Sequence, residues 1–268
     1  MKNLLLNLKT NKRVKFIIIA VLITLSLYGR AFLSEGLGAA SLIIGAIIVL
    51  VGTYYTQEIS RKIDTIPVIL MPVFLYSAAI LSLSYFPNLG NPTKFLALTA
   101  VGVIYYIVSL VNNIFIVVES EEKRIPLYRV AVTWSQILLI VISIPFFAGL
   151  FKVPVDPISQ NLFSFVASML FSLYLLWALS FDDEIRDYGL KEAFSKSIVV
   201  GFIVFCSGVA VSFIPTESFL RAIFVSSVMM SVLGYIQNHY KNAVTTRLIY
   251  EYILISFVFL IILLIFIP

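Results

Sequence analysis

Residues 130–151 read VAVTWSQILLIVISIPFFAGLF, a run without a single charged side chain. A helix needs roughly 20 apolar residues to cross the hydrocarbon core of a bilayer, which is about 30 Å thick. Apolar residues follow one another here instead of alternating with polar ones, which favours a membrane-spanning helix over a strand of a membrane barrel. This stretch therefore predicts one transmembrane helix.

Further runs of the same kind occur along the whole chain. The predicted spans are residues 16–33, 37–55, 66–86, 95–118, 130–151, 162–181, 197–214, 219–236 and 253–267. Of the 268 residues, 60% are hydrophobic and 12% are charged, whereas soluble domains carry about 25% charged residues. We therefore expect an all-α fold, a polytopic integral membrane helix bundle of about nine transmembrane helices that forms a single domain over residues 1–268.

Lysine and arginine are distributed unequally between the two sides of this predicted bundle. Fifteen of the 19 lysines and arginines fall at the N-terminus and in the alternate loops that share its side. Short loops rich in these residues stay in the cytoplasm when a membrane protein inserts. We expect a cytoplasmic N-terminus, a C-terminus outside, and a multi-pass protein of the cytoplasmic (inner) membrane.

The segment 1–15 is a basic cytoplasmic segment in this topology. It holds Lys2, Lys9, Lys12, Arg13 and Lys15, which together equal the net charge of +5. A basic segment beside a first span is attracted to anionic lipids of the inner leaflet. Nucleic-acid binding would instead need a basic face on the folded domain. The expected partners are the lipid bilayer and these anionic lipids, with no nucleic acid, and the sequence identifies no protein partner.

Residues that catalyse reactions or hold metals are scarce. Cys206 is the single cysteine and His239 the single histidine, which excludes an internal disulfide, a His-Glu-x-x-His zinc site and a haem with two histidine ligands. Inside the nine runs only Arg30 and Arg221 carry a charge. Ion-coupled transporters keep ionisable residues near the midplane, so a coupled transporter is disfavoured. We expect no catalytic centre and no cofactor.

Glycines recur with a spacing of seven residues in two of the spans. Gly38, Gly45 and Gly52 share one face of the second span, and Gly201 and Gly208 share one face of the seventh. Small residues let the backbones of two membrane helices approach closely. The spacing predicts tight helix packing along both stripes, and a substrate groove against the first stripe is the alternative.

Amides occur at similar depths in the fourth and fifth spans. Asn112 and Asn113 lie near the predicted cytoplasmic end of one, and Ser135 and Gln136 lie at a similar depth in the other. Consecutive spans are antiparallel, so we expect these side chains to meet and to bond the helices by about 1 kcal/mol. The alternative is that Asn112, Asn113 and Gln136 form a polar lining that binds a substrate.

Acidic residues gather between the sixth and seventh spans, where residues 181–192 read FDDEIRDYGLKE. Asp183 and Asp187 are four residues apart, so both carboxylates would share one face of a helix and could hold Mg²⁺ that bridges to a diphosphate. This Asp-x-x-x-Asp pattern resembles the second acidic motif of prenyltransferases of the UbiA superfamily, which have nine helices and a cytoplasmic active site. The resemblance implies Mg²⁺-dependent transfer to or from a lipid diphosphate, with Asp183 and Asp187 as metal ligands.

The chain departs from that family at the family's first acidic motif, because residues 53–60 read TYYTQEIS and hold one acid. A surface helix also explains the loop before the seventh span, since acid-to-base pairs four residues apart stabilise a solvated helix. These pairs are Asp182/Arg186, Asp187/Lys191 and Glu192/Lys196. Residues 119–129 mix both signs of charge in the same way and are expected to be solvated.

Three functions remain after these exclusions. The favoured one is a non-catalytic scaffold, or the membrane subunit of an envelope or lipid-handling assembly. The alternatives are the Mg²⁺-dependent prenyl or lipid-diphosphate transferase and a facilitative carrier or flippase for a neutral or lipid solute. Residues 112–129, within a bundle that lacks a soluble domain, resemble uncharacterised polytopic membrane proteins of small-genome bacteria, and this second resemblance implies no activity.

Overall fold

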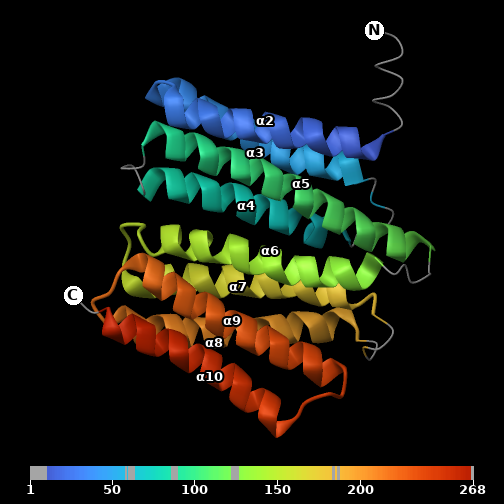
Figure 1. Cartoon of the computed structure of the whole chain (residues 1–268), viewed down its shortest axis with the longest axis vertical. Helices are drawn as coiled ribbons and strands as arrows, with labels where there is room; N and C mark the ends of the chain where they lie inside the picture. Colours follow the sequence, from blue (N-terminus) through green and yellow to red (C-terminus); the bar gives the residue numbers. More distant parts are fainter. Residues whose placement is uncertain are drawn as a thin grey trace. The chain divides into compact units, whose positions relative to one another are not determined.

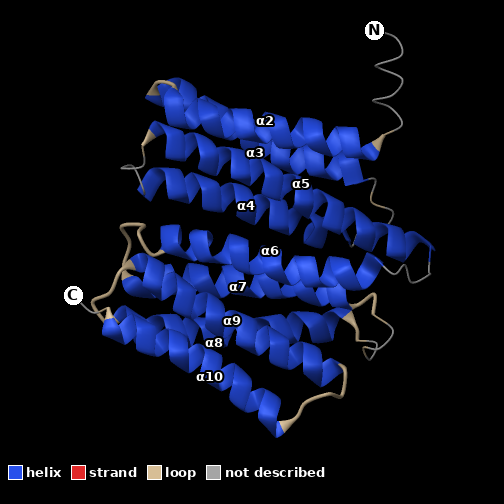
Figure 2. Ribbon diagram, in the orientation of Figure 1, coloured by secondary structure: helices blue, strands red, loops and turns tan. Residues whose placement is uncertain are grey.

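The structure is a computed structural model that describes residues 11–57, 59, 64–85, 90–121, 127–182, 185 and 188–266, without the side chains of residues 120 and 121. All regular structure in these residues is helical (Figures 1 and 2). The helices are α2 (Lys12–Phe32), α3 (Glu35–Gln57), α4 (Thr65–Tyr85), α5 (Asn91–Glu121), α6 (Leu127–Leu150), α7 (Pro157–Leu179), α8 (Leu190–Ser212), α9 (Ser218–Tyr240) and α10 (Thr246–Ile265).

Each of the nine predicted spans coincides with one of these helices. All nine are long and apolar enough to cross a membrane, counted over the described residues. The protein is therefore an all-helical, multi-pass membrane protein. The side on which the termini lie stays a prediction, and we call the end where α3 turns to α4 and α7 turns to α8 the predicted cytoplasmic end.

Two helices begin well before the predicted spans. α8 starts at Leu190 and α10 at Thr246, whereas the spans were expected from residues 197 and 253. The added turns carry charges, among them Arg247, whose Nε bonds Glu251 Oε1 at 2.9 Å. Backbone hydrogen bonds form regardless of side-chain polarity, so a helix continues past the point where its apolar run ends.

The chain divides into two compact units, Met1–Leu138 and Leu139–Pro268, and the division falls within α6. In unit 1, α2 packs against α3, α4 and α5. In unit 2, α7, α8 and α9 pack against one another and α10 packs on α9. A single domain over residues 1–268 stays a prediction.

The glycine stripe of α3 lies where α3 packs against α2 and α4. A Cβ atom built on Gly45 would overlap the hydroxyls of Ser26 in α2 and Tyr76 in α4, and one built on Gly52 would lie 2.9 Å from Ile19 Cδ1 in α2. The predicted tight packing along this stripe is confirmed. Its partners are α2 and α4.

The glycine stripe of α8 serves the same purpose in unit 2. A Cβ on Gly201 would lie 2.9 Å from the Phe165 carbonyl oxygen of α7, and one on Gly208 would overlap Asn161 Oδ1. The facing surface of α7 is also made of small side chains. Ser164 and Ser172 are fully buried, and their hydroxyls bond carbonyls of their own helix at 3.1 and 2.6 Å. The prediction for Gly201 and Gly208 is confirmed.

Asp156 starts α7 by capping its free N–H groups. Its Oδ2 accepts from the Ser159 backbone N–H at 2.9 Å, its Oδ1 accepts from the Ser159 hydroxyl at 2.7 Å, and Pro157 occupies the first helical position. These bonds favour the carboxylate and hold the pKa of Asp156 below its ordinary value of 3.8. Because the folded pKa is lowered, the stabilisation is present above the ordinary pKa and is lost as pH falls through the folded pKa.

We expect Asp156→Ala to lower the thermal midpoint modestly at neutral pH, because the cap is lost. The difference from the wild type should close in acid, where the wild-type carboxyl is also protonated. Asp156→Asn keeps an acceptor for the Ser159 N–H and serves as the control. Thermal unfolding of the wild type and the two variants, followed by circular dichroism over a pH series, measures these midpoints. A difference that stays constant into acid would contradict this account.

Candidate functional site

Polar side chains of α3 and α5 meet inside unit 1. The hydroxyls of Thr53 and Tyr105 lie 2.9 Å apart, and one turn further along, Gln57 Nε2 donates to the Ser109 carbonyl oxygen at 3.0 Å. Gln57 is fully buried, and its Oε1 has no hydrogen-bond partner among the described residues. A buried acceptor left without a donor costs about 1–3 kcal/mol.

Asn112 of α5 forms a hydrogen bond with α4 at a backbone carbonyl that a proline leaves without its usual donor. Pro72 lies inside α4 and has no N–H, so it cannot donate to the Val68 carbonyl one turn earlier. The fully buried Asn112 supplies a donor instead, since its Nδ2 lies 2.9 Å from the Val68 oxygen. Asn112 therefore bonds two helices, as predicted. Its partner is α4, whereas the sequence analysis expected a partner on the following span.

Substituting Asn112 tests this assignment. We expect Asn112→Ala to lower the free energy of unfolding by about 1 kcal/mol, because the Val68 carbonyl loses a donor that the α4 backbone cannot replace. Pro72→Ala restores the backbone N–H, so Asn112→Ala should have a smaller effect in that background. The measurement is a double-mutant cycle of unfolding free energies. Equal effects in both backgrounds would show that Asn112 does not compensate for Pro72.

The other predicted amides have different surroundings. Asn113 is half-buried and its Oδ1 has no hydrogen-bond partner in the described part of the chain. It lies one turn after Ser109, whose carbonyl binds Gln57. Gln136 is half-buried on α6, and the buried Ser135 donates to the Val132 carbonyl of its own helix at 2.7 Å. The expected contact of Asn112 or Asn113 with Gln136 stays a prediction.

Two buried carboxylates lie at the predicted cytoplasmic end of unit 1, and sequence reasoning identified neither as a site residue. Asp64 is 4% exposed and precedes α4, and Glu119 is 8% exposed in the last turn of α5. Seven residues separate Asn112 from Glu119, so both lie on the face of α5 that meets α4. The expectation that residues 119–129 are solvated is wrong for Glu119, because α5 extends past the apolar run and carries it into the packed helix pair.

A sequence signal for Asp64 was present. It stands directly before Thr65, Ile66 and Pro67, and an acid followed by a proline within the first turn is typical of a helix N-terminus. Glu119 had no such signal, because its burial depends on which helix α5 meets. Carboxylate and amide oxygens are ligands that Mg²⁺ prefers. Among the residues that the structure describes, no three His, Cys, Asp or Glu side chains are grouped to hold a metal ion.

Asp183 and Asp187 lie outside the described residues, as do Arg186 and Glu184. Around them, Asp182 accepts an ion pair from Lys241 at 3.2 Å, and the Tyr188 ring stacks on Tyr240 with centroids 4.3 Å apart. The Tyr188 hydroxyl donates to the Leu176 carbonyl. Asp182, Ile185, Tyr188 and Gly189 are not helical. Among the described residues, the predicted surface helix is therefore wrong at these four positions, and it is helical from Leu190 on. The contacts of Asp182 and Tyr188 with α7 and α9 favour the non-helical backbone.

No protein-family model, curated protein or solved structure matches the chain. Function is therefore inferred from the chain's own residues and their geometry.

Proposed function

We propose that the protein is a non-catalytic integral membrane subunit, a scaffold within an envelope or lipid-handling assembly of the cytoplasmic membrane, with its N-terminus in the cytoplasm. The observation that carries this proposal is the bond from Asn112 to the Val68 carbonyl. Asn112 was a candidate substrate-binding residue together with Asn113 and Gln136, and its bond between two helices supports a structural role for it.

Other polar side chains in the spans are used in the same way. Gln160 Nε2 donates to the carbonyl oxygens of Phe151 and Val153 at 3.3 and 2.7 Å, where α6 ends. Arg221, one of two charged residues in the predicted spans, donates to the Ile214 carbonyl at 3.0 Å, just after α8. Helix ends leave carbonyls without partners, so these polar side chains support the frame of the bundle.

The test combines an activity assay with cross-linking. The purified full chain in lipid nanodiscs should show no turnover of isoprenyl diphosphates with Mg²⁺. A photo-reactive residue placed at Lys241, at the predicted cytoplasmic end, should cross-link to one reproducible membrane protein in native membranes. The same group at Val258, exposed on α10, is the control and should give mainly lipid adducts. Turnover by the purified chain alone would refute the scaffold.

A second candidate is the Mg²⁺-dependent prenyl or lipid-diphosphate transferase. Its support is the resemblance at Asp183 and Asp187. Within unit 1, considered by itself, the carboxylates of Asp64 and Glu119 are buried. Under this function Mg²⁺ with a diphosphate would be held at the predicted cytoplasmic face.

This candidate requires that an isoprenyl diphosphate raises the thermal midpoint only when Mg²⁺ is present. Asp183→Ala should abolish that rise. Asp182→Ala is the matched control, because it removes the ion pair with Lys241 and should lower the starting midpoint while keeping the rise. The transferase is refuted when Asp183→Ala retains the full Mg²⁺-dependent rise.

A further inference from the structure

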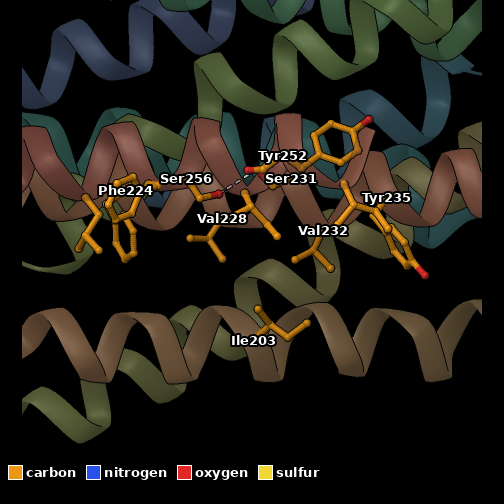
Figure 3. A pocket seen from close by; sticks show the side chains of 12 residues that line it. Ile203, Phe224, Val228, Ser231, Val232, Tyr235, Tyr252 and Ser256 are labelled. Atoms are coloured by element: carbon orange, nitrogen blue, oxygen red, sulfur yellow. Dashed lines mark hydrogen bonds between the residues drawn. The ribbon is translucent and has the colours of Figure 1, made fainter. Parts of the chain in front are cut away.

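An apolar groove of about 460 Å³ lies on unit 2 where α8, α9 and α10 meet. Figure 3 shows Ile203 of α8 across the groove from Val228 and Val232 of α9. The hydroxyls of Ser231 and Ser256 in the wall lie 3.0 Å apart, and the Tyr252 hydroxyl accepts from Asn238 Nδ2, outside the lining, at 3.0 Å. The groove therefore offers a hydrocarbon surface to its occupant.

The length of the groove matches one leaflet of a bilayer. On α9 its lining runs from Phe224 to Tyr235, a rise of about 16 Å at 1.5 Å per residue. Half of the hydrocarbon core is about 15 Å. Tyr235 lies nearer the predicted cytoplasmic end, where tyrosines mark the membrane–water interface. The groove therefore runs along the middle of α9, with Tyr235 at the end that lies towards the predicted cytoplasmic side.

The narrow apolar shape of the groove suits an acyl chain. The groove holds about 460 Å³. α10 packs on α9, and Leu263 alone among the residues of α10 is buried, so the groove wall is reached directly from the hydrocarbon core.

A cation stands at the end of the groove where a lipid headgroup would lie. Lys196 precedes Ile203 by seven residues, which places both on one face of α8. α8 and α9 are antiparallel neighbours, so seven residues back along α8 correspond to seven residues forward along α9, from Val228 to Tyr235. Lys196 and Tyr235 therefore lie at a similar depth. Lys196 is half-buried, and within the described part of the chain it has no ion pair. Its charge complements a phosphate at the level of Tyr235.

We propose that this groove binds an acyl chain of an anionic glycerophospholipid from the predicted cytoplasmic leaflet, with the lipid phosphate at Lys196. The proposal goes beyond the scaffold function and does not depend on it, because a scaffold and a transferase could each carry such a lipid. It assigns a binding site to α8–α10, a part of the chain in which neither function has a site.

Filling the groove tests the acyl-chain part. The full chain, purified in detergent, is titrated with dioleoylphosphatidylglycerol while bound lipid is counted by native mass spectrometry and the thermal midpoint is recorded. Val228→Trp should remove most of the bound lipid and of the midpoint rise. Val258→Trp, on the opposite face of α10 from Ser256, is the matched control and should keep both. Val232→Trp replaces Val228→Trp if the latter does not fold.

Neutralising the cation tests the headgroup part. Lys196→Gln should weaken the preference for phosphatidylglycerol over phosphatidylcholine roughly fivefold, the effect of one lysine at a membrane surface. Lys191→Gln, on a different face of α8, should leave the preference unchanged. If Lys196→Gln and Lys191→Gln show the same preference for phosphatidylglycerol over phosphatidylcholine, the phosphate contact at Lys196 is refuted. Three other results would overturn the acyl-chain site. Inorganic phosphate could raise the thermal midpoint as much as the lipid does, or folded Val228→Trp could still bind lipid. The third is that the wild type forms an oligomer through the groove and Val228→Trp is a monomer.

Discussion

Replacing Gly45 with alanine is expected to lower the free energy of unfolding by about 1–3 kcal/mol, the usual effect of overfilling a packed interior. Gly45 lies where α3 meets both α2 and α4, and the added methyl group would overlap the hydroxyls of Ser26 and Tyr76. Those hydroxyls lie 3.3 Å apart, and the Tyr76 hydroxyl also donates to the Leu42 carbonyl at 3.0 Å. The substitution therefore separates a polar contact that joins three helices.

The control lies in the same helix. A Cβ on Gly36 would meet no atom within 4 Å, so Gly36→Ala should keep or raise the stability, because alanine favours a helix by up to about 1 kcal/mol over glycine. Titration of the purified chain with a denaturing detergent, followed by circular dichroism, measures both variants. A similar effect of the two substitutions would mean that helix propensity, and not packing, decides the outcome at Gly45.

Replacing Gly208 with alanine is expected to have the larger effect, about 2–4 kcal/mol, because overpacking is joined by the loss of an interhelical hydrogen bond. The Asn161 side chain is fully buried against Gly208, and its Nδ2 donates to the Ser212 hydroxyl at 2.9 Å and to the Pro157 carbonyl at 2.7 Å. A methyl group on Gly208 would overlap Asn161 Oδ1 and push the amide away from both acceptors.

A second substitution separates this mechanism from a general defect of α8. Asn161→Ala removes the side chain that the new methyl group would meet. In that background Gly208→Ala should cost less than about 1 kcal/mol, which is a strong negative coupling between the two positions. The fluorescence of Trp177 in α7 reports the unfolding of unit 2, while Trp134 lies in unit 1. Additive effects would show that Gly208 is required for another reason.

Much of the fold was predictable because the bilayer sets a simple requirement. A membrane-spanning chain needs long apolar runs whose backbone groups are bonded within each helix, and nine such runs predicted nine helices of the described chain. Glycines at 38, 45 and 52 also predicted close packing, since helix periodicity places them on one face. These features depend on spacing within a single helix, so no neighbouring element needs to be known.

The candidate site was predicted less well, because its residues depend on contacts between helices. Asn112 was predicted to bond helices, yet its bond to Val68 needs the pairing of α5 with α4 and the proline that leaves a carbonyl without its donor. The sequence did not single out Gln57, although it is fully buried and its Oε1 has no hydrogen-bond partner among the described residues. The apolar groove combines three helices, and no single run of residues marks it.

Spacing and composition alone were enough to establish an all-helical, multi-pass membrane protein and its glycine-packed faces, because hydrophobicity and helical periodicity act within each segment. Burial of Glu119, the donor that Asn112 offers to Val68, and the groove between α8, α9 and α10 came only from the folded chain. The physical reason is that burial and hydrogen-bond partners belong to pairs of helices, and many pairings of the same apolar helices satisfy the bilayer equally well.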